Sequence, residues 1–197
     1  MFLRGVESVR VLLAVSDPGT RNTIRELLFH NGYSVSGEAH NASEALRICR
    51  SQSPEMVIMD SELEGGRVGQ VAMILEEDGV APVLILASSA DPWIKDFSYI
   101  LKPVTATNLI PAIESTLTGY RKRMRLLQEV ARLQKQLATR RAVDIAKGIL
   151  MLEQGMSEEQ AHRFLQKTSM DRGLPLKAVA EAVIALSKTS GKGESEL

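Results

Sequence analysis

The sequence predicts an α/β domain with a parallel sheet, followed by a smaller all-α segment. Short apolar stretches alternate with amphipathic helical patterns over roughly the first 118 residues, an order that buries parallel strands between helices. After residue 119 the helical periodicity continues without a further strand pattern. The length of 197 residues, with 44% hydrophobic and 24% charged residues, suits one ordinary domain plus a smaller one.

Five apolar segments indicate strands, and helical patterns separate most of them. We expect strands at residues 9–15, 33–39, 56–60, 82–87 and 99–101, helices at 19–30, 42–50 and 68–77, and a further helix beginning near Asn108. The segment between Ala87 and Lys102 is short for a helix with its connections, which together need about ten or more residues. We therefore expect the helix between the fourth and fifth strands to be shortened or missing.

Several polar residues fall where these strands end. Asp60 ends the third strand and Lys102 follows the fifth, while Asp17 and Ser88 follow the first and the fourth. Ligand sites in parallel sheets lie at the carboxyl ends of the strands. The VIMD sequence that ends at Asp60 and the Lys102-Pro103 pair together resemble the receiver domain of two-component response regulators, which has a flavodoxin-like fold. Residues 1–118 are accordingly expected to form a receiver-like domain.

The resemblance implies a role for each of these edge residues. Asp60 takes the position of the phosphoryl acceptor, and Lys102, Ser88 and Asp17 take positions that support the phosphate. Receivers hold Mg²⁺ with two adjacent carboxylates after the first strand, but Val15 and Ser16 occupy those positions here. We therefore expect a degenerate receiver that phosphate does not switch, and no metal or other cofactor. Asp17 and Asp60 remain weak Mg²⁺ candidates, relevant only if the receiver is functional.

Residues 119–139 are predicted to form a coiled-coil connector. Leucine and valine recur there at alternating spacings of four and three, which is the pattern of a helical seam. Its members are Leu126, Val130, Leu133 and Leu137. A bare apolar stripe needs a partner, and parallel pairing with a second copy is the simple solution. The alternative is that the stripe packs back on the chain's own domains.

Residues 140–188 are predicted to form three short helices. Gly155 suits a left-handed helix end, Ser157 with Gln160 forms a capping box for the next helix, and Gly173 suits its end. The segment resembles the ANTAR domain, an RNA-binding output module of antitermination regulators of the AmiR/NasR type. The resemblance rests on AKGILM at residues 146–151 and on Gly155, Ala161, Phe164, Leu165, Ser169, Leu176, Val179 and Ala180.

Charge is unevenly distributed along the chain. The formal net charge is zero, yet residues 119–148 are strongly basic, which is a hint of a nucleic-acid-binding module. A solvated helix face explains such a pattern equally well on charge alone. The cations that we expect to lie near RNA are Arg140, Arg141, Lys147, Arg163, Lys167 and Arg172.

These patterns together predict a dimeric RNA-binding transcription antitermination regulator and no enzyme. The resemblance implies paired stem-loops in nascent mRNA leaders as targets, with a sensor kinase or a sequestering sensor protein as a further partner. Two alternatives stay open: a phosphorylation-switched response regulator with DNA-binding output, and a protein-interaction adaptor. No signal peptide, membrane span or cysteine pair is apparent, so a cytoplasmic location is expected. Residues 189–197 are expected to be a disordered tail.

Overall fold

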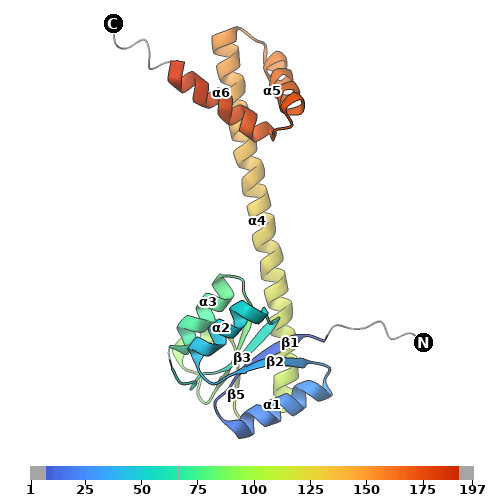
Figure 1. The fold of residues 1–197 in the computed structure, drawn as a ribbon, viewed down its shortest axis with the longest axis vertical. Coiled ribbons are helices and arrows are strands. Elements are labelled where there is room, and N and C mark those ends of the chain that lie inside the picture. The colour runs from blue at the N-terminus through green and yellow to red at the C-terminus, as the bar shows by residue number, and fades with distance from the viewer. Residues whose placement is uncertain (1–7, 66, 191–197) are drawn as a thin grey trace, which may run out of the picture. The chain divides into compact units, whose positions relative to one another are not determined.

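The computed structural model describes residues 8–65 and 67–190 (Figure 1). The chain divides into two compact units, Met1–Arg125 and Leu126–Leu197. One helix, α4 at Ala106–Gln154, begins in the first unit and ends in the second. It covers residues that the sequence assigned to the end of the receiver-like domain, the connector and the first helix of the ANTAR segment.

The first unit contains a parallel five-stranded sheet with the strand order β2-β1-β3-β4-β5. This order is the flavodoxin-like one, so the predicted fold class is confirmed. The predicted strands are all present, with bounds that differ by at most two residues. They are β1 Arg10–Ala14, β2 Ser34–Ala39, β3 Met56–Asp60, β4 Val83–Ala87 and β5 Ser98–Leu101.

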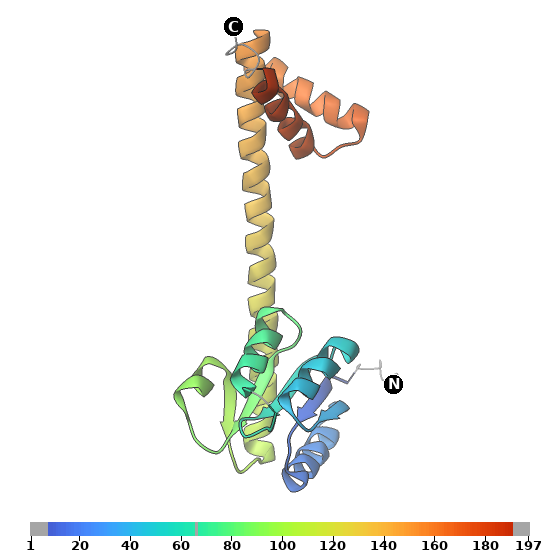
Figure 2. The same cartoon turned by 60° about the vertical axis from the view of Figure 1, so that its left-hand side comes forward.

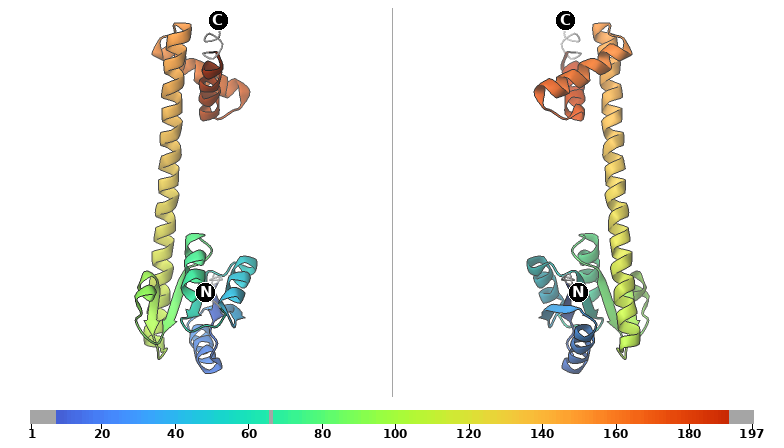
Figure 3. Two further views of the ribbon diagram at one scale, coloured as in Figure 1. Left: turned by 90° about the vertical axis from the view of Figure 1, so that its left-hand side faces the viewer. Right: turned by 90° about the vertical axis from the view of Figure 1, so that its right-hand side faces the viewer.

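Helices cover both faces of this sheet (Figures 1 and 3). One face packs against α1 at Pro18–His30 and the first turns of α4, through buried residues such as Ile24 and Ile113. The other face packs against α2 at Ala42–Gln52 and α3 at Val68–Glu77. The strands are apolar on both faces because both faces are covered. The carboxyl ends of the strands remain as the edge where polar residues meet.

The segment between β4 and β5 contains a short 3-10 helix, η1 at Pro92–Asp96, in place of the usual α-helix. The predicted loss of that helix is thus confirmed. Trp93 in η1 packs on the first turn of α3, where a Cβ added to Gly69 would lie 2.9 Å from Trp93 Cε3. Trp93 and Phe97 also line a cavity of about 530 Å³ beside Glu62. Trp93 therefore packs on part of the sheet face that a longer helix would cover.

The second unit consists of the later part of α4, α5 at Glu158–Arg172 and α6 at Leu176–Ser190 (Figure 2). These helices share one small apolar cluster rich in alanine, which lets helix backbones approach closely. Its buried members are Ala142, Val143, Ala146, Leu150, Ala161, Leu165, Val179 and Ala180. The predicted all-α three-helix arrangement is confirmed.

The predicted helix boundaries of this unit are also present. Gly155 and Gly173 adopt positive φ angles of 64° and 62°. Ser157 and Gln160 form the full capping box at the start of α5. Helix α6 extends to Ser190, and residues 191–197 of the predicted tail lie outside the described residues. Among the described residues, none of the helices is both long and apolar enough to span a membrane.

Candidate functional site

Asp60 and Lys102 form the centre of the polar edge of the sheet. Asp60 ends β3 and is 4% exposed. Lys102 Nζ lies 3.0 Å from Asp60 Oδ1 and 2.8 Å from Oδ2, so the ammonium contacts both carboxylate oxygens. Glu62 Oε2 lies 3.8 Å from the same ammonium, and the Glu62 amide donates to Asp60 Oδ1 at 3.1 Å. The structure thus brings together two of the four predicted edge residues and adds Glu62, whose only sequence signal is its closeness to Asp60.

Asp17 and Ser88 are not part of this pair. Asp17 caps α1, where its Oδ2 accepts a hydrogen bond from the Thr20 amide at 2.7 Å. Hydrogen bonds from the hydroxyl and the amide of Thr20, with a smaller contribution from the charge of Lys102, lower the pKa of Asp17 from its ordinary value. Ser88 is exposed just after β4, and within the described part of the chain no hydrogen bond joins it to Asp60 or Lys102.

The edge does not fit a magnesium ion. Hard cations of this kind require several oxygen ligands, including carboxylates. Here Val15 stands at the end of the first strand, Asp17 is engaged as a helix cap, and Asp60 is neutralised by Lys102. Among the described residues no group of three or more His, Cys, Asp or Glu side chains is placed to hold a metal.

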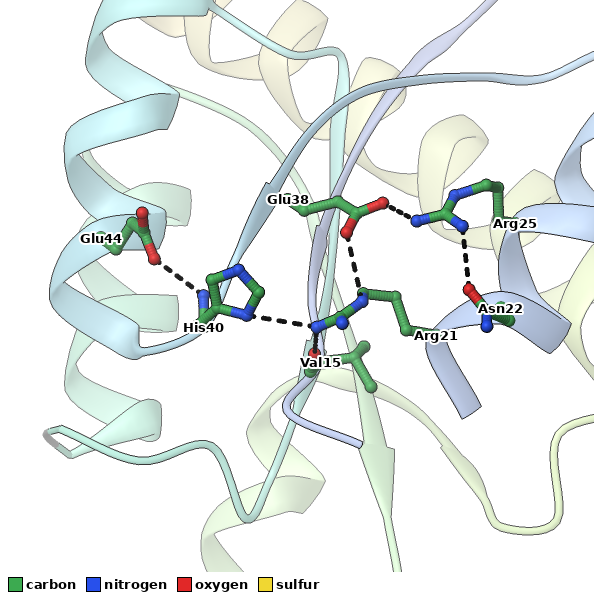
Figure 4. A network of polar contacts seen from close by, with 7 residues as sticks. All are labelled: Val15, Arg21, Asn22, Arg25, Glu38, His40 and Glu44. Atoms are coloured by element: carbon green, nitrogen blue, oxygen red, sulfur yellow. Dashed lines mark hydrogen bonds and ion pairs between the residues drawn. The ribbon is translucent and has the colours of Figure 1, made fainter. Parts of the chain in front are cut away.

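An arginine network next to this edge was not predicted from the sequence (Figure 4). Arg21 of α1 donates through Nη1 to the Val15 carbonyl at 3.0 Å, and the same nitrogen lies 3.2 Å from His40 Nδ1. Arg21 Nε lies 3.1 Å from Glu38 Oε2, and Arg25 pairs with the other Glu38 oxygen. A guanidinium therefore occupies the end of β1, next to the place where receivers put their metal-binding carboxylates. Nothing in the local spacing of these residues signals the network.

The predicted seam on α4 is exposed along its length. Leu126 is 58% exposed, Leu133 49% and Leu137 50%, and Val130 between them is 49% exposed. The alternative that this stripe packs back on the chain's own domains finds no support in these values. A row of half-exposed leucines on one helix face is unusual for a surface without a partner.

The six candidate RNA-binding cations fall into two groups. Lys147 Nζ contacts Glu158 Oε1 at 2.9 Å and Asp144 Oδ1 at 3.0 Å, and hydrogen bonds to Glu158 and then Asp144 raise its pKa. Arg163 pairs with Glu159 at 2.5 Å, and Arg140 lies 4.0 Å from an Asp144 oxygen.

The second group is free of such partners. Arg141, Lys167 and Arg172 are exposed and, within the described residues, form no ion pair. These three side chains are therefore available to an external anion without first breaking an internal contact. Lys147 is the least available of the six because its side chain is only 17% exposed and carries two carboxylate neighbours. Glu158, which lies across the helix joint from Lys147, was missed from the sequence.

The fold and these sites define a class of protein: a receiver-like domain whose sheet edge carries an Asp-Lys pair, joined to a helical output unit. Residues 131–184 match the ANTAR domain family. The transcriptional regulatory protein PdtaR of Mycobacterium tuberculosis is 32% identical over 182 residues, which cover 89% of this chain and 89% of that protein. The chain belongs to the family of ANTAR-domain response regulators.

Two further comparisons agree with this assignment. The aliphatic amidase regulator of Pseudomonas aeruginosa is 27% identical over 85 residues, 43% of each chain. The crystal structure of the receiver domain of a modulated diguanylate cyclase from Desulfovibrio desulfuricans G20 superposes with a TM-score of 0.55 and 26% identity, covering 59% of this chain and 99% of that domain. The curated relatives are named as regulators, and the diguanylate cyclase is matched through its receiver domain alone.

Proposed function

We propose that the chain is an RNA-binding transcription antitermination regulator that dimerises and binds paired stem-loops in nascent mRNA leaders. The observation that carries this proposal is the set of cations Arg141, Lys167 and Arg172 on the helices of the ANTAR region, which form no ion pair with any residue that the structure describes. Phosphate contacts by lysine and arginine supply most of the affinity of nucleic-acid-binding proteins. Structured RNA is recognised through its backbone, its shape and the bases of its loops.

The exposed seam supports dimerisation through α4. Four apolar side chains at alternating spacings of four and three match the seam of a parallel coiled coil, and each is about half exposed in the single chain. A second copy would cover this face with an identical face, as twofold symmetry requires. Two ANTAR units joined in this way would bind two stem-loops with the gain that effective concentration gives to linked sites.

The receiver-like domain is proposed to act without phosphorylation. Asp60 is already paired with Lys102 at 2.8 Å, and the adjacent carboxylates that hold a metal in receivers are replaced by Val15 and Ser16. Contact with a sequestering sensor protein is then a better route for the input signal than phosphoryl transfer from a sensor kinase. Incubation with acetyl phosphate and magnesium tests this: phosphorylation of Asp60 that changes RNA affinity would contradict the proposal.

A gel-shift experiment tests RNA binding directly. The full chain is titrated against paired stem-loop RNA and against duplex DNA over a series of salt concentrations. We expect RNA preference and a steep loss of affinity with salt. Preference for duplex DNA would favour the DNA-binding alternative, and binding to neither would favour the adaptor.

A charge-reversal variant locates the RNA surface. Changing Arg141, Lys167 and Arg172 together to glutamate should weaken RNA binding by at least ~100-fold and should reduce the salt slope by roughly two to three. The matched control reverses Arg47, Arg50 and Lys95, three exposed cations of the receiver-like domain, and so changes the net charge equally. Equal loss in both variants would show a nonspecific charge effect and no defined surface.

A further inference from the structure

A groove on the second unit lies at the start of the three-helix packing, between α4 and the first residue of α6. Its volume is about 420 Å³, which falls at the lower end of the range of small-ligand pockets, roughly 300–1,000 Å³. It is lined by Arg132, Lys135, Gln136, Thr139, Arg140, Val143 and Leu176. A groove of this size suits one nucleotide and is far too small for a duplex.

The rim of the groove is cationic and contains no carboxylate among its lining residues. Arg132 is held by Glu129 through contacts of 2.8 and 2.6 Å, so it is not the most available cation. Lys135 is exposed and forms no ion pair within the described residues, and Arg140 is 85% exposed with its nearest carboxylate oxygen 4.0 Å away. Lys135 and Arg140 therefore offer two positive charges to a phosphodiester that crosses the rim.

The exposed lining of the groove is mostly apolar, and its polar atoms are confined to the side chains at its rim. Val143 is 7% exposed and belongs to the core cluster, and Leu176 packs against that cluster from α6. Thr139 already donates its hydroxyl to the Lys135 carbonyl at 2.9 Å. In the part of the chain that the structure describes, the Gln136 amide forms no hydrogen bond, so both its donors and its acceptor are available.

Part of the groove lies away from the seam. At about 100° per residue, Thr139 and Val143 project roughly 80–160° around the α4 axis from Leu133 and Leu137, and Gln136 roughly 60–100°. Arg140 projects only about 20° from Leu133 and therefore lies beside the seam. A dimer formed through the leucine seam would leave the side of the groove formed by Thr139 and Val143 exposed on each copy. This geometry matches a target with two equivalent binding elements.

We propose that this groove binds one unpaired loop base of the target RNA, with Gln136 reading the base edge and Lys135 and Arg140 contacting the adjoining phosphates. The base face rests on Val143 and Leu176. Sequence-specific RNA recognition commonly uses splayed loop bases that are hydrogen-bonded along their edges. The inference rests on the proposed RNA-binding function and deepens it by naming the subsite that distinguishes one loop from another.

The test uses the full chain and a stem-loop RNA selected by that chain from a pool of paired hairpins with randomised loops. Each loop nucleotide is replaced in turn by an abasic one, and the affinity of native protein is measured for every RNA. At one loop position we expect a loss of about 10- to 100-fold. In the Gln136→Leu variant the same abasic replacement should cost several-fold less than in native protein, because the hydrogen bonds to the base edge are already lost and only the apolar contacts with Val143 and Leu176 remain.

Gln128→Leu serves as the matched control, since Gln128 is also exposed on α4 but does not line the groove. It should keep the full abasic penalty. If Gln136→Leu also keeps that penalty while RNA still binds, the groove assignment is wrong and the proposed function stands. If no RNA is selected from the pool, the proposed function itself fails. A change in dimer affinity caused by Gln136→Leu without RNA would assign the groove to the second copy and overturn the inference.

Discussion

The two units of this chain are stabilised in different ways. In the first, both faces of a five-stranded sheet are buried, and large side chains such as Leu12, Ile58 and Leu84 are fully inaccessible. In the second, half of the buried cluster is alanine, while Leu133 and Leu137 remain half exposed. The first unit therefore buries large apolar side chains on both faces of its sheet, whereas the second leaves part of its apolar surface exposed in the single chain.

The charged residues of the two units also differ in how many of their contacts lie within the chain. At the sheet edge of the first unit, Asp60 is buried and bound by Lys102, and Arg21 is held by Glu38 and His40. On the second unit, Arg141 and Lys167 are exposed without an internal partner among the described residues. The charges at the sheet edge of the first unit are thus paired with one another, whereas these two cations of the second unit are available to an external ligand.

The largest expected effect concerns the exposed seam. Leu133→Asp should weaken the dimer by at least ~100-fold, because each copy would place a carboxylate in an apolar seam. Sedimentation equilibrium measures the change directly. Gln128→Asp, on another face of α4, adds the same charge and should leave the dimer intact. A native chain that sediments as a monomer at all concentrations would refute dimerisation through the seam.

A pair of core substitutions compares the two interiors. Ile58→Ala should lower the free energy of unfolding of the first unit by about 3–5 kcal/mol. Leu165→Ala should lower that of the second unit by about 2–3 kcal/mol. The second effect is smaller because a cavity lined by small residues collapses more easily. Trp93 is the only tryptophan, so its fluorescence follows the first unit during urea unfolding, while far-UV circular dichroism follows the helices of both. Equal shifts in both signals for each variant would show that the units unfold together.

The Asp60-Lys102 pair gives a smaller effect in the first unit. Lys102→Met should destabilise that unit by about 2–3 kcal/mol, because it leaves a buried carboxylate unpaired. Adding Asp60→Asn should recover much of this loss. The exposed Lys95 provides the control, and Lys95→Met should change stability by less than about 0.5 kcal/mol. Additive effects in the double variant, measured by urea unfolding, would show that the two residues do not interact.

The smallest effect is the pH dependence of the Lys147-Glu158 contact. The hydrogen bond from Lys147 lowers the pKa of Glu158 from its ordinary value of 4.5. The contact therefore contributes to stability above about pH 4.5, and this contribution is lost as the pH falls through the lowered pKa. The melting temperatures of native chain and Glu158→Gln should differ at pH 7 and converge at low pH. Glu153→Gln, at an exposed glutamate without an ion pair among the described residues, should match native chain throughout.

The sequence by itself determined the strands, their order and most helix ends, but not that α4 runs unbroken from Ala106 to Gln154. The apolar run that ends at Asp60 predicts β3 with its observed bounds, and Ser157 with Gln160 predicts the start of α5. The short segment after Ala87 predicts the missing helix. These features depend on residues that are close in the chain, so local periodicity and capping rules contain the information needed to predict them.

Only the tertiary structure decided which charged side chains form ion pairs within the described residues and where a groove forms on the surface. The pairing of Lys147 with Glu158 crosses a helix joint, and the Arg21 network joins α1 to the ends of β1 and β2. The groove needs Leu176 of α6 beside Val143 of α4. Such contacts depend on distances between separate elements, which the spacing of residues along the chain does not specify, because helix packing sets them.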